Sequence, residues 1–213
     1  MKTKQLRFLV TAGPTREFLD PVRYISNRSS GKMGYALAEA ALAMSEHVTL
    51  VSGPTALTPP KQVEFVPVIT AEEMAEAVWS RFDNADICIM AAAVCDFRPK
   101  KTAANKLKKS TFAGTLELES TPDILSELGR RKMKQVLVGF AVETENMETQ
   151  AQQKLAQKQL DFIVANDTGA FDADTNRVAL IAKDGKIERF SEMPKTEVAK
   201  MVVERAVRLV PDA

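Results

Sequence analysis

The stretch ISNRSSGKMG, residues 25–34, determines how the rest of the chain is interpreted. Ser29, Gly31 and Gly34 have the spacing of the dinucleotide-binding pattern G-x-G-x-x-G, with serine in place of the first glycine. Glycines here let backbone N–H groups approach an anion, and the following helix directs its positive dipole end to the same point. A Ser/Gly-rich helix cap without a ligand fits the pattern equally well. A Walker A loop is excluded, because Ser26 occupies the place of its first glycine.

Apolar runs alternate with helix-forming segments along almost the whole chain. Apolar runs predict strands at residues 6–12, 47–52, 63–68, 86–92, 135–142 and 161–165, and the runs at 6–12, 86–92 and 135–142 are typical of buried strands. Helices are expected at residues 33–44, 71–82, 122–132, 147–159 and 194–210. Thr70 with Glu73 forms a capping box for the second helix, and Thr121 is expected to cap the third. Asp184-Gly185 predicts a hairpin between strands at 177–183 and 186–190.

This alternation predicts an α/β fold with a doubly wound, mainly parallel Rossmann-like sheet that ends in an antiparallel hairpin. The chain has 213 residues, 45% of them hydrophobic, which suits a single Rossmann-like domain over residues 1–213. The 29 basic and 28 acidic residues nearly cancel, so no basic field predicts nucleic-acid binding. No stretch approaches the roughly 20 apolar residues of a membrane span. We therefore expect a cytoplasmic protein that binds neither membrane nor nucleic acid.

Polar residues that could act on a ligand are expected in the loops at the carboxyl edge of the sheet. Residues 97–120 are basic and largely aperiodic, which predicts an excursion out of the sheet that ends in a strand. Its lysines fit a triphosphate clamp or a solvated loop, and charge alone favours the loop. Lys154 and Lys158 lie four residues apart on one helix face, which fits an anion site or a solvated face, and spacing alone favours the solvated face. His47, the one histidine, begins a strand, so the expected chemistry is positioning and charge stabilisation, as in nucleotidyl transfer.

Six segments taken together resemble one enzyme family in order and spacing over nearly the whole chain. They are ISNRSSGKMG, AAAVCDFRP, NKLKKS, TPDIL, VGFAVET and the AND of residues 165–167. In these segments the chain is similar to phosphopantothenate–cysteine ligase, also called phosphopantothenoylcysteine synthetase. In many bacteria this ligase is the C-terminal half of a fusion with a flavin-dependent decarboxylase. Because Met1 leads directly into the first expected strand, we expect a free-standing bacterial ligase, with a separate decarboxylase acting next.

The resemblance implies a reaction in coenzyme A biosynthesis. The carboxylate of 4′-phosphopantothenate attacks the α-phosphate of CTP, an acyl-cytidylate forms, and pyrophosphate leaves. The amine of L-cysteine then attacks the acyl carbon, and CMP departs. Mg²⁺ assists, and the family is a homodimer that uses the excursion at 97–120 in its interface. No base-reading side chain indicates CTP rather than ATP, so that preference rests on the similarity to bacterial members.

The resemblance also implies roles for individual residues. Asn27 resembles the residue that holds the acyl-cytidylate, with its amide donating to the acyl oxygen while cysteine adds. Lys106 resembles the residue that stabilises charge on the α-phosphate. The residues that resemble substrate and nucleotide contacts are Ser29, Ser30, Gly31, Met90, Ala91, Ala92, Asp96, Pro122, Asp123, Ile124, Leu125, Phe140, Lys154 and Lys158. Phe140 among them resembles a wall of the base pocket, and no residue is assigned to a metal.

Two other classes of function are weighed against the ligase. A regulatory subunit could keep the fold and bind a nucleotide without catalysis, but the presence of both Asn27 and Lys106 argues against it. An NAD(P)-dependent reductase would need an acidic residue after the second strand to hold the ribose. Ser52-Gly53-Pro54 stands there instead, and the Tyr-x-x-x-Lys pair of short-chain reductases is missing.

Overall fold

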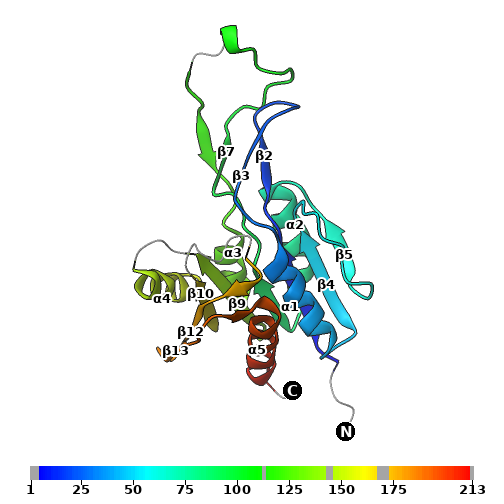
Figure 1. The fold of residues 1–213 in the computed structure, drawn as a ribbon, viewed down its shortest axis with the longest axis vertical. Helices are drawn as coiled ribbons and strands as arrows, with labels where there is room; N and C mark the ends of the chain where they lie inside the picture. Colours follow the sequence, from blue (N-terminus) through cyan, green and yellow to red (C-terminus); the bar gives the residue numbers. More distant parts are fainter. Residues whose placement is uncertain (1–4, 112–113, 143–145, 167–172, 212–213) are drawn as a thin grey trace.

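An eight-stranded sheet forms the centre of the structure, a computed structural model that describes residues 5–111, 114–142, 146–166 and 173–211. Its parallel strands are β1 (Arg7–Ala12), β4 (His47–Ser52), β5 (Glu64–Pro67), β6 (Ile87–Met90), β9 (Val136–Val142) and β10 (Phe162–Asn166). The antiparallel strands are β12 (Val178–Ala182) and β13 (Ile187–Arg189). The order across the sheet is β13-β12-β10-β9-β6-β1-β4-β5 (Figure 1). The predicted fold class, including the C-terminal hairpin, is confirmed.

Helices cover both faces of the sheet, because its strands are apolar on both sides. One core lies between the sheet and the helices α1 (Lys32–Leu42) and α5 (Lys195–Arg208). The other core lies beneath α2 (Ala71–Phe82), α3 (Ile124–Arg131) and α4 (Met147–Gln157). The alternation along β1 shows the division, since Phe8 and Val10 belong to the first core and Leu9 to the second.

The start of one predicted helix is confirmed and that of another is wrong. Thr70 and Glu73 form the expected capping box at the start of α2. The helix α3, however, is capped by Asp123, whose side chain accepts from the N–H of Ser126 at 3.1 Å. Thr121 cannot serve as this cap, because its hydroxyl donates to the carbonyl of Cys95 and ties the chain to the loop after β6.

Two glycines of the opening stretch fix where α1 begins. Gly31 precedes the helix with φ +79°, a left-handed conformation that L side chains rarely adopt. Gly34 lies against the end of β1, where an added Cβ would come within 2.4 Å of the Cβ of Ala12. The absence of side chains at both positions therefore lets the first turn of α1 sit directly on the carboxyl end of β1.

An arm made of residues 16–26, 97–111 and 114–120 rises from the body of the molecule (Figure 1). It holds two antiparallel pairs, β2 (Arg16–Phe18) with β3 (Tyr24–Ser26), and β7 (Phe97–Pro99) with β8 (Leu118–Ser120). A short 3₁₀ turn, η1, spans Lys109–Thr111. The excursion therefore exists as predicted, but the strand at its end is shorter than expected. The hairpin of β2 and β3 was not predicted.

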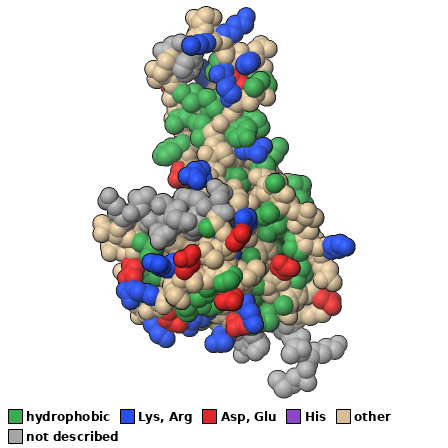
Figure 2. All heavy atoms as spheres, in the orientation of Figure 1, with side chains coloured by type: hydrophobic (Ala, Val, Ile, Leu, Met, Phe, Trp, Pro, Cys, Tyr) green, Lys and Arg blue, Asp and Glu red, His purple; other side chains and the backbone are tan. Residues whose placement is uncertain are grey.

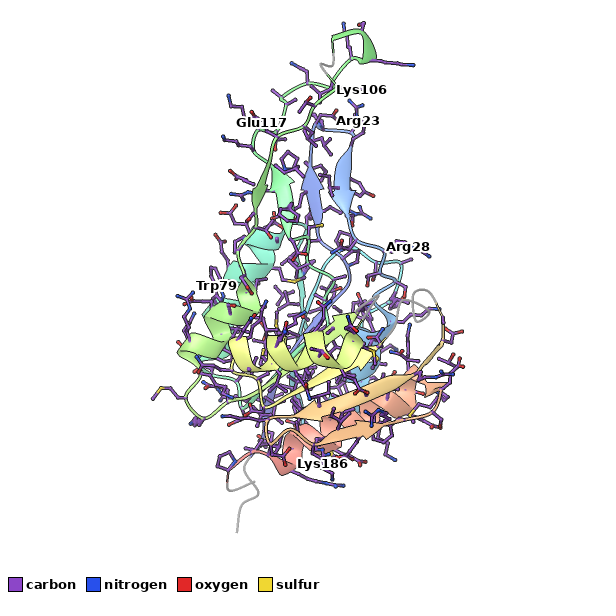
Figure 3. The ribbon with its side chains drawn as sticks, turned by 90° about the vertical axis from the view of Figure 1, so that its left-hand side faces the viewer. Arg23, Arg28, Trp79, Lys106, Glu117 and Lys186 are labelled. Atoms are coloured by element: carbon purple, nitrogen blue, oxygen red, sulfur yellow. The ribbon has the colours of Figure 1, made fainter. Side chains whose placement is uncertain are left out.

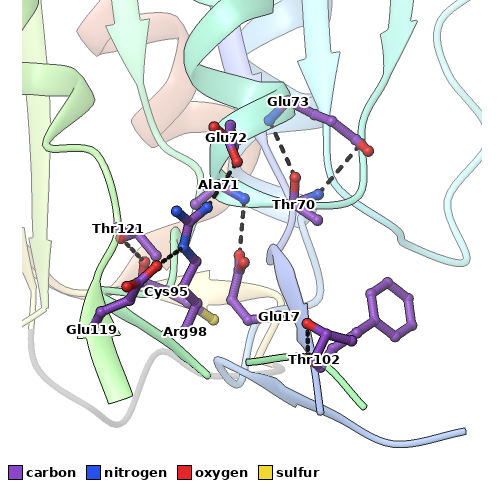
Figure 4. A network of polar contacts seen from close by, with 11 residues as sticks. Glu17, Thr70, Ala71, Glu72, Glu73, Cys95, Arg98, Thr102, Glu119 and Thr121 are labelled. Carbon is purple, nitrogen blue, oxygen red and sulfur yellow. Dashed lines mark hydrogen bonds and ion pairs between the residues drawn. The ribbon is translucent and has the colours of Figure 1, made fainter. Parts of the chain in front are cut away.

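Hydrogen bonds and ion pairs hold the arm together and attach it to the body. Glu17 of β2 accepts from the N–H of Ala71 at 2.8 Å, and Arg98 of β7 binds Glu72 and Glu119 (Figure 4). Nearer the tip, the fully buried Asp20 accepts from the Arg23 guanidinium at 2.6 Å. Burial alone would raise the pKa of Asp20. The hydrogen bonds from Arg23 and from three backbone N–H groups nevertheless hold its pKa well below the ordinary value.

A last pair of short strands brings the C-terminal region to the same edge of the sheet as α1. β11 (Thr175–Asn176) pairs with β14 (Met193–Pro194), which leads directly into α5. Asp167 of the AND segment lies outside the described residues. None of the helices in the described ranges combines the length and apolar character that crossing a membrane requires.

Candidate functional site

A cavity of about 340 Å³ lies at the carboxyl edge of the parallel strands. It gathers residues from the loop before α1, the loop after β6, the ends of β9 and β10, and the helices α4 and α5. Nine of the residues predicted from the sequence line it, namely Asn27, Ser29, Ser30, Gly31, Ala91, Ala92, Asp96, Phe140 and Lys154. Met90 is buried directly before Ala91, at the end of β6.

The start of α1 forms the part of this cavity that suits an anion. The side chain of Ser29 accepts from the N–H of Gly31 at 3.3 Å, which shapes the turn before the helix. No side chain caps α1, and its first turn contains no acidic residue. The N–H groups and the positive end of the helix dipole are therefore complementary to a negatively charged ligand.

Asn27 is held at the cavity by the loop after β6. Its Nδ2 donates to the carbonyl of Val94 at 2.8 Å and to that of Ala93 at 3.3 Å. The shorter bond fixes the plane of the amide. The longer one is at the weak end of the range for N–H···O bonds, so that hydrogen can be redirected to a ligand oxygen. The amide thus offers a ligand the acceptor Oδ1 and one displaceable donor.

The loops after β1 and β6 are joined to each other, which stabilises the position of Asn27. The N–H of Ala93 donates to Gly13 at 2.9 Å, and the N–H of Cys95 donates to the hydroxyl of Thr15 at 2.9 Å. Cys95 is buried, and burial raises the pKa of its thiol. A protonated, buried thiol is a poor nucleophile, so we assign Cys95 to packing and to this connection between loops.

Cationic side chains outnumber acidic ones around the cavity. Lys154 of α4 donates to the carbonyl of Phe140 at 3.2 Å, so its ammonium lies beside the wall formed by β9. Lys32 forms an ion pair with Asp174 at 2.7 Å, and this pair lowers the pKa of Asp174. Asp96 is the one carboxylate among the described residues that line the cavity.

Several residues of this wall carry no role assigned from the sequence. Arg28 and Lys32 stand inside the opening stretch, and Asn166 inside the AND segment, so their motifs indicated them as polar groups that could touch a ligand. Asn176 and Lys195 also line the cavity. No local pattern marks these two, because only the pairing of β11 with β14 brings them to this edge.

The segment that begins with Pro122 lies outside the lining of the cavity. Ile124 and Leu125 are buried in the core beneath α3, while Asp123 is exposed. Lys158 of the predicted phosphate pair binds Asp123 at 2.9 Å and does not line the cavity. Burial would raise the pKa of Asp123, but the hydrogen bonds from Lys158 and Ser126 lower it.

Lys106 lies on the arm, far from Arg28 at the rim of the cavity (Figure 3). Its neighbour Leu107 is fixed to the tip, with its carbonyl accepting from Arg23 at 2.7 Å and its N–H donating to Asp20 at 3.2 Å. In this arrangement a single chain does not bring Lys106 to its own cavity.

Among the described residues, neither a metal cluster nor a second groove competes with this cavity. No group of three or more His, Cys, Asp or Glu side chains within them could hold a metal ion. A larger groove of about 670 Å³ lies at the amino edge of the sheet, between the starts of β1 and β4 and the end of α2. It contains none of the predicted site residues, so its size does not make it a better candidate.

The family described as "DNA/pantothenate metabolism flavoprotein C-terminal domain" matches residues 3–209 of this chain. The chain is 50% identical over 206 residues to the coenzyme A biosynthesis bifunctional protein CoaBC of Bacillus subtilis (strain 168), covering 94% of this chain and 51% of that protein. It is 47% identical over 210 residues to a cysteine/cysteine sulfinic acid decarboxylase of an unknown prokaryotic organism, a match that covers 96% of this chain and 58% of that protein. The chain thus spans about half the length of the curated relatives it matches.

Solved structures agree with this grouping. The crystal structure of the C-terminal domain of the coenzyme A biosynthesis bifunctional protein CoaBC is 45% identical, with a TM-score of 0.84. That match covers 98% of this chain and 97% of the other. A Cab2 mutant in complex with phosphopantothenate-cysteine has a TM-score of 0.80, and the match covers 96% of this chain and 87% of the other. Its identity is 18%, so it supports the fold alone.

Proposed function

We propose that this chain, which belongs to the DNA/pantothenate metabolism flavoprotein C-terminal domain family, is a phosphopantothenate–cysteine ligase that uses CTP. The observation that carries the proposal is the convergence of nine predicted residues on one cavity at the carboxyl edge of the sheet. These residues come from four separate parts of the chain, and the family resemblance assigns all of them to one reaction. A reductase is disfavoured because β4 ends at the buried Ser52, which offers no carboxylate to a ribose.

In the first half-reaction the chain has to bind the triphosphate of CTP close to the carboxylate of phosphopantothenate. The start of α1 and the ammonium of Lys154 hold the phosphates of CTP. The carboxylate of phosphopantothenate then attacks the α-phosphate, and pyrophosphate leaves. Asp96 is the residue of this cavity that would hold Mg²⁺ together with substrate phosphates, where the ion would neutralise phosphate charge.

In the second half-reaction the amine of L-cysteine attacks the acyl carbon of the acyl-cytidylate, and CMP leaves. Asn27 can give up its 3.3 Å contact with Ala93 and donate that hydrogen to the acyl oxygen as negative charge develops there. The 2.8 Å contact with Val94 keeps the amide in place during this change. The backbone at Ala91 and Ala92 and the ring of Phe140 border the space in which the base would lie.

The role proposed for Lys106 requires a second chain or a movement of the arm. Four large apolar side chains are exposed on the arm, namely Val22 (58% exposed), Phe97 (54%), Leu118 (47%) and Tyr24 (42%). Figure 2 shows hydrophobic side chains gathered along it. Exposed apolar patches mark interaction sites, so we propose a homodimer formed through the arm, in which Lys106 acts on the cavity of the other subunit.

The remaining proposals concern the setting of the enzyme. Cys88 and Cys95 are free and buried, which suits a reducing compartment, and we propose a cytoplasmic location. A flavin-dependent decarboxylase would use the product next, and the relative from Bacillus subtilis is named a bifunctional protein of coenzyme A biosynthesis.

The test of the proposed function is formation of phosphopantothenoylcysteine from phosphopantothenate, L-cysteine and CTP, followed by mass spectrometry and pyrophosphate release. We expect CMP as the second product and slower turnover with ATP. Omission of cysteine should leave acyl-cytidylate on the enzyme. Absence of both product and intermediate with every nucleoside triphosphate would favour a regulatory nucleotide-binding protein.

A further inference from the structure

Two lysines converge on one corner of the cavity, next to the short strand β11. Lys32 reaches it from the first turn of α1, and its Nζ lies 2.7 Å from Asp174. Lys195 reaches it from the first residue of α5, and its Nζ donates to the carbonyl of Ala173 at 2.7 Å. Both lysines line the cavity, so this corner is positively charged and directly joined to the proposed active site.

Lys195 is buried, with 8% of its surface exposed. Lysine is among the residues least often found in a protein interior, because removing its charge from water is costly. Because Lys195 lies in the wall of the proposed substrate cavity, its charge can serve to bind a ligand. A substrate anion in the cavity would interact with the ammonium in surroundings that screen the attraction less than bulk water does.

The same corner contains a buried acceptor that lacks a donor. Asn176 lines the cavity and is 5% exposed, and among the described residues no donor lies within hydrogen-bond distance of its Oδ1. Buried side-chain oxygens almost always accept a hydrogen bond, and an exception calls for an explanation. A ligand N–H or O–H group placed in the corner would satisfy this oxygen.

Building on the proposed function, we propose that Lys195 and Asn176 form the subsite for the α-amino acid substrate, L-cysteine. Lys195 binds the carboxylate, and Asn176 Oδ1 accepts a hydrogen bond from the amine, which lies one carbon away. Other parts of the cavity already match the other substrates, since the phosphates fit the start of α1 and the acyl group fits Asn27. The corner therefore provides both complementary groups that an amino acid needs.

The subsite is tested by separating the two half-reactions in Lys195→Met, with Lys200→Met as a control at an exposed position of the same helix. Acyl-cytidylate formation without cysteine should match the wild type, while the KM for L-cysteine rises roughly 10- to 100-fold, because a charge-assisted hydrogen bond is lost. Cysteamine has the amine and thiol of cysteine but no carboxylate. It should therefore react equally well with the wild type and with Lys195→Met.

A second variant keeps the inference testable if Lys195→Met does not fold. Asn176→Leu removes the acceptor and should raise the KM for L-cysteine and cysteamine alike, by roughly tenfold. The inference is overturned if both variants keep the wild-type KM for L-cysteine, or if they lower acyl-cytidylate formation instead, which would assign the corner to the nucleotide. Failure of the wild type to form acyl-cytidylate would be a different result, which refutes the proposed function itself.

Discussion

Replacement of Asn27 by aspartate should separate the two half-reactions, and the structure indicates how large the cost to folding will be. The change removes two hydrogen bonds, from Nδ2 to Val94 at 2.8 Å and to Ala93 at 3.3 Å. Each is worth roughly 0.5–1.5 kcal/mol in net stability, and Asn27 is exposed, so a loss of about 1 kcal/mol is expected. A carboxylate oxygen would also face these two carbonyl oxygens, which turns the side chain away from its position.

The effect on chemistry should be much larger than this cost. Loss of a donor that stabilises developing negative charge lowers rates by roughly 10²- to 10³-fold, and only the attack of cysteine needs this donor. Asn27→Asp should therefore still form acyl-cytidylate from CTP and phosphopantothenate but couple cysteine very slowly. Lys106→Gln should form neither intermediate nor product, because charge on the α-phosphate develops in the first half-reaction.

Single-turnover mixtures without cysteine, analysed by mass spectrometry, decide between these outcomes. Lys106 is exposed on the arm, so Lys106→Gln should fold as well as the wild type, and its thermal unfolding serves as the control. If both variants accumulate the intermediate, or if neither does, the assignment of separate roles to Asn27 and Lys106 is refuted.

Mixing the two variants tests whether Lys106 acts across the proposed dimer. After exchange of subunits, about a quarter of the wild-type activity should return, because half of the dimers are mixed and each has one intact site. If Lys106 served its own chain, every site would retain one defect and the mixture would stay inactive.

Three other predictions concern the arm and the lysines Lys154 and Lys158. Phe97→Ser should shift the protein from dimer to monomer in sedimentation at micromolar concentration, while Phe65→Ser, on the edge strand β5, leaves the dimer intact; a monomeric wild type would contradict this. Lys154→Ala should raise the KM for CTP roughly 3- to 10-fold with a smaller change in kcat, and Lys158→Ala less; unchanged CTP binding in both would indicate a solvated helix face. Because the pKa of Asp20 is lowered in the folded state, its contribution to stability is present above its ordinary pKa and is lost as pH falls. The difference in Tm between wild type and Asp20→Asn should therefore shrink below about pH 4, and a constant difference would contradict the reasoning.

The body of the fold was predictable because its signals are local. Central strands such as β6 and β9 are continuous apolar runs, and the turn at Asp184-Gly185 was recognisable without any knowledge of distant contacts. The start of α3 was mispredicted for a tertiary reason, since the hydroxyl of Thr121 is used by the carbonyl of Cys95. The hairpin of β2 and β3 was missed because it depends on contacts with residues 97–120, such as the hydrogen bond from Thr102 to Phe18.

The candidate site shows the same division between local and distant information. The opening stretch marked Ser29, Ser30 and Gly31, because phosphate binding at a helix start needs a short and recognisable sequence. Lys195 and Asn176 left no such mark, since each reaches the cavity only through the pairing of β11 with β14.

Lys106 presents the opposite difficulty. A motif identifies it, but the fold of a single chain does not bring it to its own cavity. Its position is set by Arg23 and Asp20, which hold Leu107 at the tip of the arm. The buried charge of Asp20 makes this tip costly to rearrange, since breaking a buried ion pair leaves an uncompensated charge. The exposed apolar side chains of this arm, Val22, Tyr24, Phe97 and Leu118, suit docking on a second copy of the chain. The position of Lys106 is therefore itself an argument for a site completed between two subunits.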